Sequence, residues 1–190
     1  MKIAIIGKGS VGSALETGLT RNGHEVRAVG RGEPLSEAAS SAELVVLAVP
    51  FAEIDNVVPE LSEAVAGKVL IDATNALTPA MELAVTNGSS GAEELQKKLP
   101  AAKVVKAFNT AFAGSMATGR AGDVQLSGFV AADDEEAKAR VLTLVEELGF
   151  DPIDVGSLAE ARLLESLALL NIKLGYMRGY GPNSGFRLVH

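Results

Sequence analysis

The sequence predicts an α/β fold in which helices cover both faces of a doubly wound, mostly parallel β-sheet. Short runs of β-branched residues alternate with helical patterns along the chain, and the first run ends in a glycine-rich turn that opens a helix. With 190 residues the chain has room for one sizeable hydrophobic core. We therefore expect a single domain over residues 1–190, with a C-terminal helix and tail over about residues 157–190.

The first half of the chain carries a regular alternation of strands and helices. KIAIIG is a short β-branched run ended by glycine, which predicts a buried strand, and a helical pattern follows it up to the stop signal Asn22-Gly23. HEVRAVG and AELVVLAVP predict the second and third strands, of which the latter is closed by Pro50. Residues 51–66 show a helical pattern, and KVLIDAT predicts the fourth strand.

The second half continues the alternation of strands and helices and ends in a leucine-rich helix and a glycine-rich tail. AKVVKAF predicts the fifth strand, and before it Ser90 and Glu93 form the capping box of a short helix. VQLSGFVAA predicts a sixth strand, which leads into an amphipathic helix. FDPIDVG is expected at an edge of the sheet because Pro152 has no N–H for a central ladder. A leucine-rich helix over residues 157–176 and a glycine-rich tail follow.

Composition and charge exclude several classes of function. There are 24 acidic and 17 basic residues, a net charge of -7, which disfavours nucleic acid and anionic membranes as partners. Cysteine is absent and the only histidines are His24 and His190, so we expect no metal site. The longest apolar run, over residues 44–52, is too short to cross a bilayer, and Met1 leads directly into a strand without a secretion signal. We expect a cytoplasmic protein whose partners are small-molecule cofactors.

The segment GKGSVG places Gly7, Gly9 and Gly12 in a G-x-G-x-x-G pattern between the first strand and its helix. In that context the pattern is typical of Rossmann-like folds that bind dinucleotides. Gly7 would make the tight turn, Gly9 would let the backbone approach a pyrophosphate, and Gly12 would let the helix pack closely. The helix N-terminus would offer unpaired N–H groups to the anion. The alternative is an ordinary glycine turn.

The end of the second strand distinguishes NADP from NAD. An NAD enzyme usually carries Asp or Glu there to accept hydrogen bonds from the ribose. This chain instead has Gly30 and Arg31, with no carboxylate before Glu33. Because a guanidinium can hold a 2′-phosphate bidentately, the position favours NADP(H), the alternative being a surface arginine that merely follows a strand. Lys8, inside the glycine loop, would reach the same phosphate or stay in solvent.

Other candidate contacts stand at the ends of the later strands, where ligands of parallel sheets bind. Val49 and Pro50 would form an apolar wall for the adenine, or simply terminate a strand. Asn75 and Asn109 can donate and accept together, which suits a carboxamide or a ribose, although either could instead be a turn residue. We see no nucleophile elbow, metal triad or carboxylate pair, so we predict no catalytic side chain. The candidate cofactor-binding residues at these strand ends are Ala48, Val49, Pro50, Asn75, Ala107 and Asn109.

GKGSVGSAL, AVGR, LAVPF, LIDATN, VVKAFNT and GFDPIDVGSLAEARLLESL together resemble the coenzyme F-420-dependent NADP oxidoreductase family. Its members include NADPH:deazaflavin reductases and the cytosolic domain of the six-transmembrane STEAP ferrireductases. The resemblance runs essentially from end to end. It implies NADP contacts in two groups, at the glycine loop and second strand (Lys8, Gly9, Ser10, Val11, Gly30, Arg31) and at later positions (Val49, Pro50, Asn75 and the Ala113 amide toward the nicotinamide carboxamide).

The resemblance also implies the reaction. The small residues at 111–114 would leave room for a flat acceptor, a deazaflavin (coenzyme F-420) or a flavin, to stack on the nicotinamide and exchange a hydride. Archaeal deazaflavin reductases tend to carry histidine where this chain has Asn109, and the ferrireductase domains have asparagine. The alternatives are an NADPH-dependent reductase of a small carbonyl or imine, with Lys106 or Asp72 as proton donor, and a non-catalytic NADPH-binding redox sensor.

The last helix predicts an oligomer. Its apolar side chains exceed what one core of this size can bury, so we expect a homodimer. The residues on which this expectation depends are Leu163, Leu164, Leu167 and Leu170.

Overall fold

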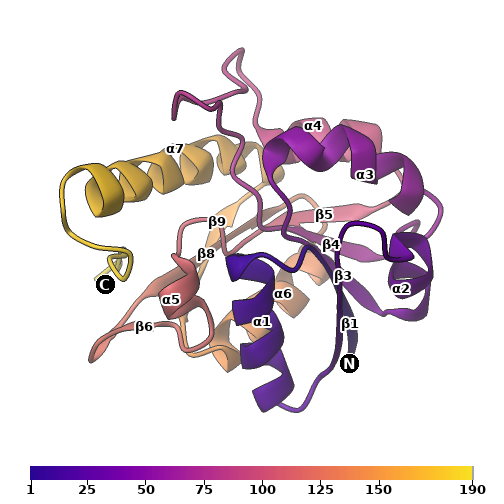
Figure 1. Cartoon of the computed structure of the whole chain (residues 1–190), viewed down its shortest axis with the longest axis horizontal. Helices are drawn as coiled ribbons and strands as arrows, with labels where there is room; N and C mark the ends of the chain where they lie inside the picture. Colours follow the sequence, from indigo (N-terminus) through magenta and orange to yellow (C-terminus); the bar gives the residue numbers. More distant parts are fainter. Residues whose placement is uncertain (190) are drawn as a thin grey trace.

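A computed structural model describes residues 1–189 of the chain and contains a seven-stranded sheet in the order β2-β1-β3-β4-β5-β8-β9 (Figure 1). The strands are β1 (Lys2–Ile6), β2 (Glu25–Val29), β3 (Leu44–Leu47), β4 (Val69–Asp72), β5 (Lys103–Lys106), β8 (Ser127–Ala132) and β9 (Asp151–Gly156). Strands β1 to β5 are parallel, β8 pairs antiparallel with β5, and β9 pairs parallel with β8. The predicted doubly wound, mostly parallel sheet is confirmed.

The helices lie on both faces of this sheet (Figure 1). They are α1 (Ser10–Arg21), α2 (Leu35–Ser41), α3 (Ile54–Leu61), α4 (Gly91–Lys98), α5 (Ala113–Met116), α6 (Glu135–Glu147) and α7 (Ala161–Ile172). Single turns flank two of them: η1 (Phe51–Glu53) precedes α3, η2 (Leu158–Glu160) precedes α7, and the π-turn η3 (Lys173–Met177) follows α7. A small antiparallel ribbon, β6 (Arg120–Ala121) with β7 (Val124–Gln125), stands apart from the main sheet.

The buried apolar residues form two clusters, one on each face of the sheet. One cluster packs α1 and α6 against the strands, with Leu15 and Val141 fully buried. The other packs α2, α3, α4 and the start of α7, and its members include the buried Leu61 and Leu95. Burial of this kind stabilises the fold by about 25 cal/mol for each Å² of apolar surface removed from water. No helix within residues 1–189 is both long enough and apolar enough to cross a membrane.

Most predicted elements are found, and the differences have simple causes. Ser90 caps α4 by accepting from the Glu93 amide at 3.1 Å, and β9 is an edge strand as Pro152 requires. The helix predicted over 51–66 ends at Leu61 and continues as turns, which leave the last five residues outside the helix. Helix α2 was not predicted, because a single short segment rich in Ala and Ser carries little helical periodicity.

Candidate functional site

The glycine loop at the end of β1 has the backbone geometry that its sequence predicts. Gly7 has φ +123°, and a Cβ there would lie 2.1 Å from the Ala48 carbonyl oxygen at the end of β3. A Cβ at Gly12 would lie 1.9 Å from the Gly7 carbonyl oxygen, so α1 packs against the loop only with glycine at that position. At Gly9 nothing lies within 4 Å of the Cβ position. The loop is therefore closed by packing at Gly7 and Gly12 and open at Gly9.

The open side of this loop coincides with the N-terminus of α1. The N-cap residue is Gly9, no side chain caps the helix, and its first turn contains no acidic residue. The first amides of a helix have no partner inside it, and they carry its partial positive charge. The loop thus presents unpartnered N–H groups beside an accessible backbone, which is the geometry that binds phosphate groups.

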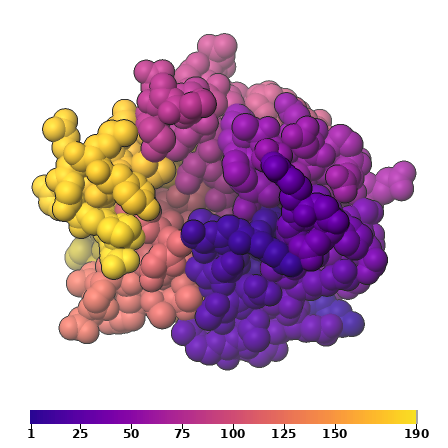
Figure 2. Space-filling view, viewed as in Figure 1, coloured from indigo at the N-terminus to yellow at the C-terminus, as the bar shows by residue number. Residues whose placement is uncertain are grey.

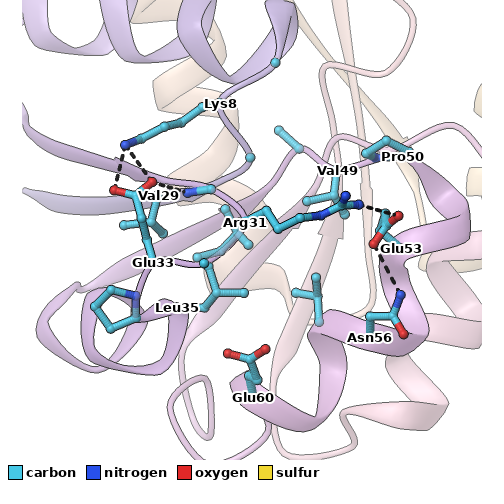
Figure 3. A pocket seen from close by; sticks show the side chains of 18 residues that line it. Lys8, Val29, Arg31, Glu33, Leu35, Val49, Pro50, Glu53, Asn56 and Glu60 are labelled. Carbon is cyan, nitrogen blue, oxygen red and sulfur yellow. Dashed lines mark hydrogen bonds and ion pairs between the residues drawn. The ribbon is translucent and has the colours of Figure 1, made fainter.

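A cleft of about 980 Å³ opens on one side of this loop, and we call it the first cleft. It lies between the carboxyl ends of β1, β2 and β3 and the helix α3. Its size is that of a cofactor site. The residues that line it are Ile6, Gly7, Lys8, Gly9, Val29, Gly30, Arg31, Gly32, Glu33, Pro34, Leu35, Ala48, Val49, Pro50, Glu53, Asn56, Val57 and Glu60 (Figure 3).

Both cations of the first cleft are paired with carboxylates that were not among the predicted site residues. The Lys8 ammonium lies 2.8 Å from Oε1 and 2.7 Å from Oε2 of Glu33, and the Arg31 guanidinium lies 2.9 Å from Oε1 of Glu53 (Figure 3). The hydrogen bond from Lys8 and a second one from the Gly30 amide lower the pKa of Glu33. Arg31 is 87% exposed, so its pair with Glu53 is weak and easily exchanged.

The sequence predicts no carboxylate at the end of β2. This prediction is wrong, because the Glu33 side chain lies there in the folded chain. Residues 30–33 form a tight turn, in which the Glu33 amide donates to the Gly30 carbonyl at 3.1 Å and Gly32 adopts φ +81°. The turn brings the Glu33 side chain back to the strand, where its Oε2 accepts from the Gly30 amide at 2.7 Å. A glycine at the third position of a four-residue turn is the sequence signal that could have predicted this return.

A second cleft of about 300 Å³ lies on the other side of the loop, and Figure 2 shows the hollow between the C-terminal residues (yellow) and the N-terminal residues (indigo). Ser10 and Val11, which directly follow Gly9, form one wall, so a single loop separates the two clefts. The residues that line the second cleft are Ser10, Val11, Asn75, Met81, Asn109, Thr110, Ala111, Phe112, Ala113, Ala168, Asn171, Ile172 and Tyr176.

Asn109 is held rigidly at the second cleft. Its Nδ2 donates to Oδ1 of Asn75 at 3.2 Å and to the Leu164 carbonyl at 3.0 Å, and Asn75 Nδ2 donates to the Asn109 carbonyl at 3.3 Å. Rotating the amide by 180° would place its oxygen against two oxygens, so these contacts fix its orientation. Asn109 is 5% exposed, and its Oδ1 has no hydrogen-bond donor within residues 1–189. A buried acceptor without a donor is unusual and is often explained by a missing ligand or water.

The backbone that carries Asn109 is strained. Phe108, directly before it, has φ +67°, a left-handed conformation that costs a bulky residue about 1–3 kcal/mol. Its ring is buried and packs against Phe150 with a centroid distance of 6.4 Å, which holds the residue in place. The strained turn directs residues 109–113 along the wall of the second cleft.

Asn171 of α7 joins this wall to the C-terminal tail. Its Nδ2 donates to the Thr110 carbonyl at 3.0 Å, and its Oδ1 accepts from the Ser184 hydroxyl at 3.3 Å. The tail continues beside β8, where the Ser127 amide donates to the Phe186 carbonyl at 3.0 Å. The sequence favours an exposed helix face for Asn171, with a pocket or a dimer contact as the alternatives. Asn171 is instead 3% exposed and lines the second cleft, because the tail brings Ser184 against it.

Lys106 and Asp72, which the sequence suggested as proton donors, are sealed in the core. The Lys106 ammonium lies 2.9 Å from Asp72 Oδ2, 3.2 Å from Glu165 Oε1 and 2.7 Å from the Thr74 carbonyl, and both Lys106 and Asp72 are 0% exposed. Glu165 also accepts from the first two amides of α4. Burial alone would lower the pKa of Lys106, but Asp72 and Glu165 outweigh it and raise the pKa. Neither residue lines either cleft.

The structure brings most of the predicted site residues together. Gly7, Lys8, Gly9, Gly30, Arg31, Ala48, Val49 and Pro50 line the first cleft, and Ser10, Val11, Asn75, Asn109 and Ala113 line the second. Gly12 and Ala107 line neither: Gly12 packs against the loop, and Ala107 is fully buried in the core. Within residues 1–189, no three His, Cys, Asp or Glu side chains are grouped as a metal site would require.

The parallel sheet, its glycine loop and the clefts on either side of that loop define a protein of the Rossmann-like, dinucleotide-binding class. The family model "NADP oxidoreductase coenzyme F420-dependent" matches residues 2–35 and 32–76. A crystal structure from Arthrobacter sp. FB24, described as an F420-dependent NADP-reductase, is 33% identical, with a TM-score of 0.91 over 100% of both chains. The chain belongs to the coenzyme F420-dependent NADP oxidoreductase family.

Two named relatives differ in how much of their own length this chain matches. Metalloreductase STEAP3 of Rattus norvegicus is 34% identical over 184 residues, and the match covers 88% of this chain and 36% of that protein. The F420-dependent NADP reductase of Methanothermobacter marburgensis is 29% identical over 168 residues, 84% of this chain and 74% of that protein. The chain thus spans about a third of the length of the STEAP3 relative. An imine reductase from Bacillus cereus, 19% identical with a TM-score of 0.68, shares the fold alone.

Proposed function

We propose that this chain is an NADP(H)-dependent oxidoreductase that transfers a hydride between NADP(H) and a ring stacked in the second cleft, either a deazaflavin (coenzyme F420) or a flavin. The observation that carries this proposal is that one glycine loop separates two clefts. Residues 7–9 line the first cleft and residues 10–11 line the second. A dinucleotide whose pyrophosphate binds at this loop has its adenosine in the first cleft and its nicotinamide at the second.

The residues of the first cleft fit NADP(H). The open backbone at Gly9 and the uncapped N-terminus of α1 would bind the pyrophosphate. Lys8 and Arg31 are the cations available to a 2′-phosphate, and Val49 and Pro50 offer an apolar wall to the adenine. The names of the F420-dependent relatives support the same nucleotide.

The second cleft would orient the reacting rings. When bound, the nicotinamide supplies the hydride chemistry, as cofactors do in enzymes of this class. The small side chains of Ala111, Ala113 and Ala168 leave its wall uncrowded, and Asn109, fixed by Asn75 and Leu164, lines the same wall. Holding two rings about 3–3.5 Å apart lowers a barrier by about 7–11 kcal/mol, so orientation alone is a large effect.

The two proton donors that the sequence suggested for the reduction of a small carbonyl or imine lie away from both clefts. Such a reaction needs a proton donor beside the nicotinamide. Lys106 and Asp72 are fully buried in their own charge cluster and line neither cleft. Hydride transfer to a deazaflavin or flavin needs no fixed acid, and the hydroxyl groups of Ser10, Thr110 and Tyr176 are the proton-bearing groups that a carbonyl or imine would meet in the second cleft.

We also propose that the chain forms a homodimer through α7. Leu163 is 65% exposed and Leu170 is 48% exposed, which leaves an uncovered apolar strip on this helix. Leu164, which the sequence placed on the same face, is instead buried against the core. Light scattering after gel filtration gives the mass of the particle, and a Leu163→Glu variant that remains a dimer would contradict this surface.

The function is tested by combining binding and turnover. Calorimetry with NADPH measures whether the nucleotide binds, and the oxidation of NADPH is then followed with coenzyme F420, with flavins and with a panel of carbonyls and imines. We expect turnover with F420 or a flavin and none with the panel. Turnover confined to carbonyls or imines would refute the proposal, whereas binding without turnover would favour a redox sensor.

A further inference from the structure

We propose that Glu33 is a specificity-determining residue that lowers the preference of the first cleft for NADP(H) over NAD(H), because it supplies the carboxylate at the end of β2. This inference rests on the proposed function, since it concerns the same nucleotide site. It adds a role that the position of Glu33 in the sequence does not suggest, because the residue lies beyond the strand and enters the cleft only through the turn at residues 30–33.

The position of the carboxylate is the first argument. Nicotinamide enzymes that select NAD usually carry Asp or Glu at the last position of the second strand, where the side chain accepts from the ribose hydroxyls. Here β2 ends at Val29 and Gly30 follows it directly, but Glu33 Oε2 lies 3.5 Å from the point where a Cβ of Gly30 would stand. The same oxygen accepts from the Gly30 amide at 2.7 Å, which fixes it there. Glu33 therefore places a carboxylate close to the location of the missing one.

The pairing of the carboxylate is the second argument. Glu33 holds the Lys8 ammonium at 2.7 and 2.8 Å, and Lys8 is one of two cations that line the first cleft. A 2′-phosphate that recruits Lys8 must compete with Glu33 for it and must also approach the negative charge of Glu33. A ribose 2′-hydroxyl has neither cost, since it can donate to the carboxylate while Lys8 stays in place. The geometry thus penalises NADP(H) and assists NAD(H).

The charge of the whole cleft points in the same direction. Glu33, Glu53 and Glu60 line it together with only Lys8 and Arg31. Arg31, the other cation, is paired with Glu53 across the cleft (Figure 3). A site with fewer cations than carboxylates does not attract a doubly charged phosphate as strongly as its two basic residues alone suggest.

The experiment compares the affinities of both nucleotides without any turnover. Dissociation constants of NADPH and NADH are measured by calorimetry for the wild type and for Glu33→Gln, a variant that keeps the shape of the side chain and its capacity to accept from the Gly30 amide. The matched control is Glu37→Gln, which removes the same charge from a nearby residue that pairs with Arg27 and does not line the first cleft. Thermal unfolding verifies that each variant folds.

We expect Glu33→Gln to bind NADPH more tightly and NADH more weakly, so that the ratio of the two dissociation constants shifts toward NADPH by about fivefold to tenfold, and by less at high salt. Glu37→Gln should leave this ratio within about twofold of the wild type, because its charge is remote and screened. An unchanged ratio in Glu33→Gln, or an equal loss for both nucleotides, would overturn the inference and leave the proposed function intact. A wild type that binds neither nucleotide would overturn both.

Discussion

Replacing Lys106 with methionine should destabilise the protein by several kcal/mol, although the residue lines neither cleft. Its ammonium is enclosed with two carboxylates, at 2.9 Å from Asp72 and 3.2 Å from Glu165, and all three residues are at most 2% exposed. Removing one partner of a buried ion pair costs about 3–5 kcal/mol, because the remaining charge stays buried without compensation. Methionine fills a similar volume, so little of this loss comes from a cavity.

Lys103 provides the matched control on the same strand. It pairs with Asp134 at 3.0 Å, but its side chain is 37% exposed. An exposed pair contributes about 0–1 kcal/mol, so Lys103→Met should have a correspondingly small effect. A domain of ordinary stability has about 5–15 kcal/mol in total, which makes the two variants easy to distinguish.

Urea unfolding followed by circular dichroism measures the difference. With a slope of about 1–3 kcal/mol/M, Lys106→Met should lower the midpoint by more than about 1 M, while Lys103→Met should barely change it. Adding Asp72→Asn and Glu165→Gln to Lys106→Met should restore part of the loss, since no charge is then buried. If Lys106→Met and Lys103→Met lose the same stability, the assignment of the cluster as a buried, mutually compensated charge set is wrong.

Three further outcomes test the loop, the arginine and an ion pair. Arg31→Ala should raise the dissociation constant of NADPH at least about fivefold and leave that of NADH nearly unchanged, and an equal loss for both in calorimetry would contradict the phosphate role. Gly12→Ala should lower the melting temperature and abolish NADPH binding, because its Cβ would lie 1.9 Å from a carbonyl oxygen, whereas Gly9→Ala should fold normally, since nothing lies within 4 Å. The Arg162 hydrogen bond lowers the pKa of Glu93 below 4.5, so the stability from this pair is present above pH 4.5 and is lost as the pH falls through the folded-state pKa. The free energy of unfolding of Glu93→Gln should therefore fall less steeply than that of the wild type as the pH is lowered below 4.5. An unchanged pH dependence would show that the pair does not contribute.

The parts of the fold that sequence reasoning predicted are those set by local patterns. The strand and the glycine loop were predictable because the G-x-G-x-x-G pattern directly follows a β-branched run. A Cβ at Gly7 or Gly12 would collide with a backbone carbonyl, and Gly9 leaves the backbone open. Helix α2 was missed because one short, small-residue segment has no distinct period.

The site residues that stand directly at strand ends were predicted. Those that a turn or a distant segment brings to the site were not. Glu33 was discounted because its distance was counted along the sequence, and a turn returns it to Gly30. An exposed helix face was favoured for Asn171 over a pocket position, but its partners, Thr110 and Ser184, come from remote segments and bury it. The polar exit of β5 was interpreted as an opening toward a cofactor. Asn109 lines the second cleft, whereas the charge of Lys106 is compensated inside the core.

The division of the two clefts along the chain has a consequence for how this family can vary. Every residue that lines the first cleft falls between positions 6 and 60, whereas the second cleft, apart from Ser10 and Val11, draws on positions 75 to 176. Under the proposed function, natural variation or recombination on the C-terminal side of α3 would therefore change the pocket for the nicotinamide and the electron acceptor, while the adenosine site is inherited intact. Chimeras joined between α3 and β4 would be a direct route to new redox pairs on one scaffold.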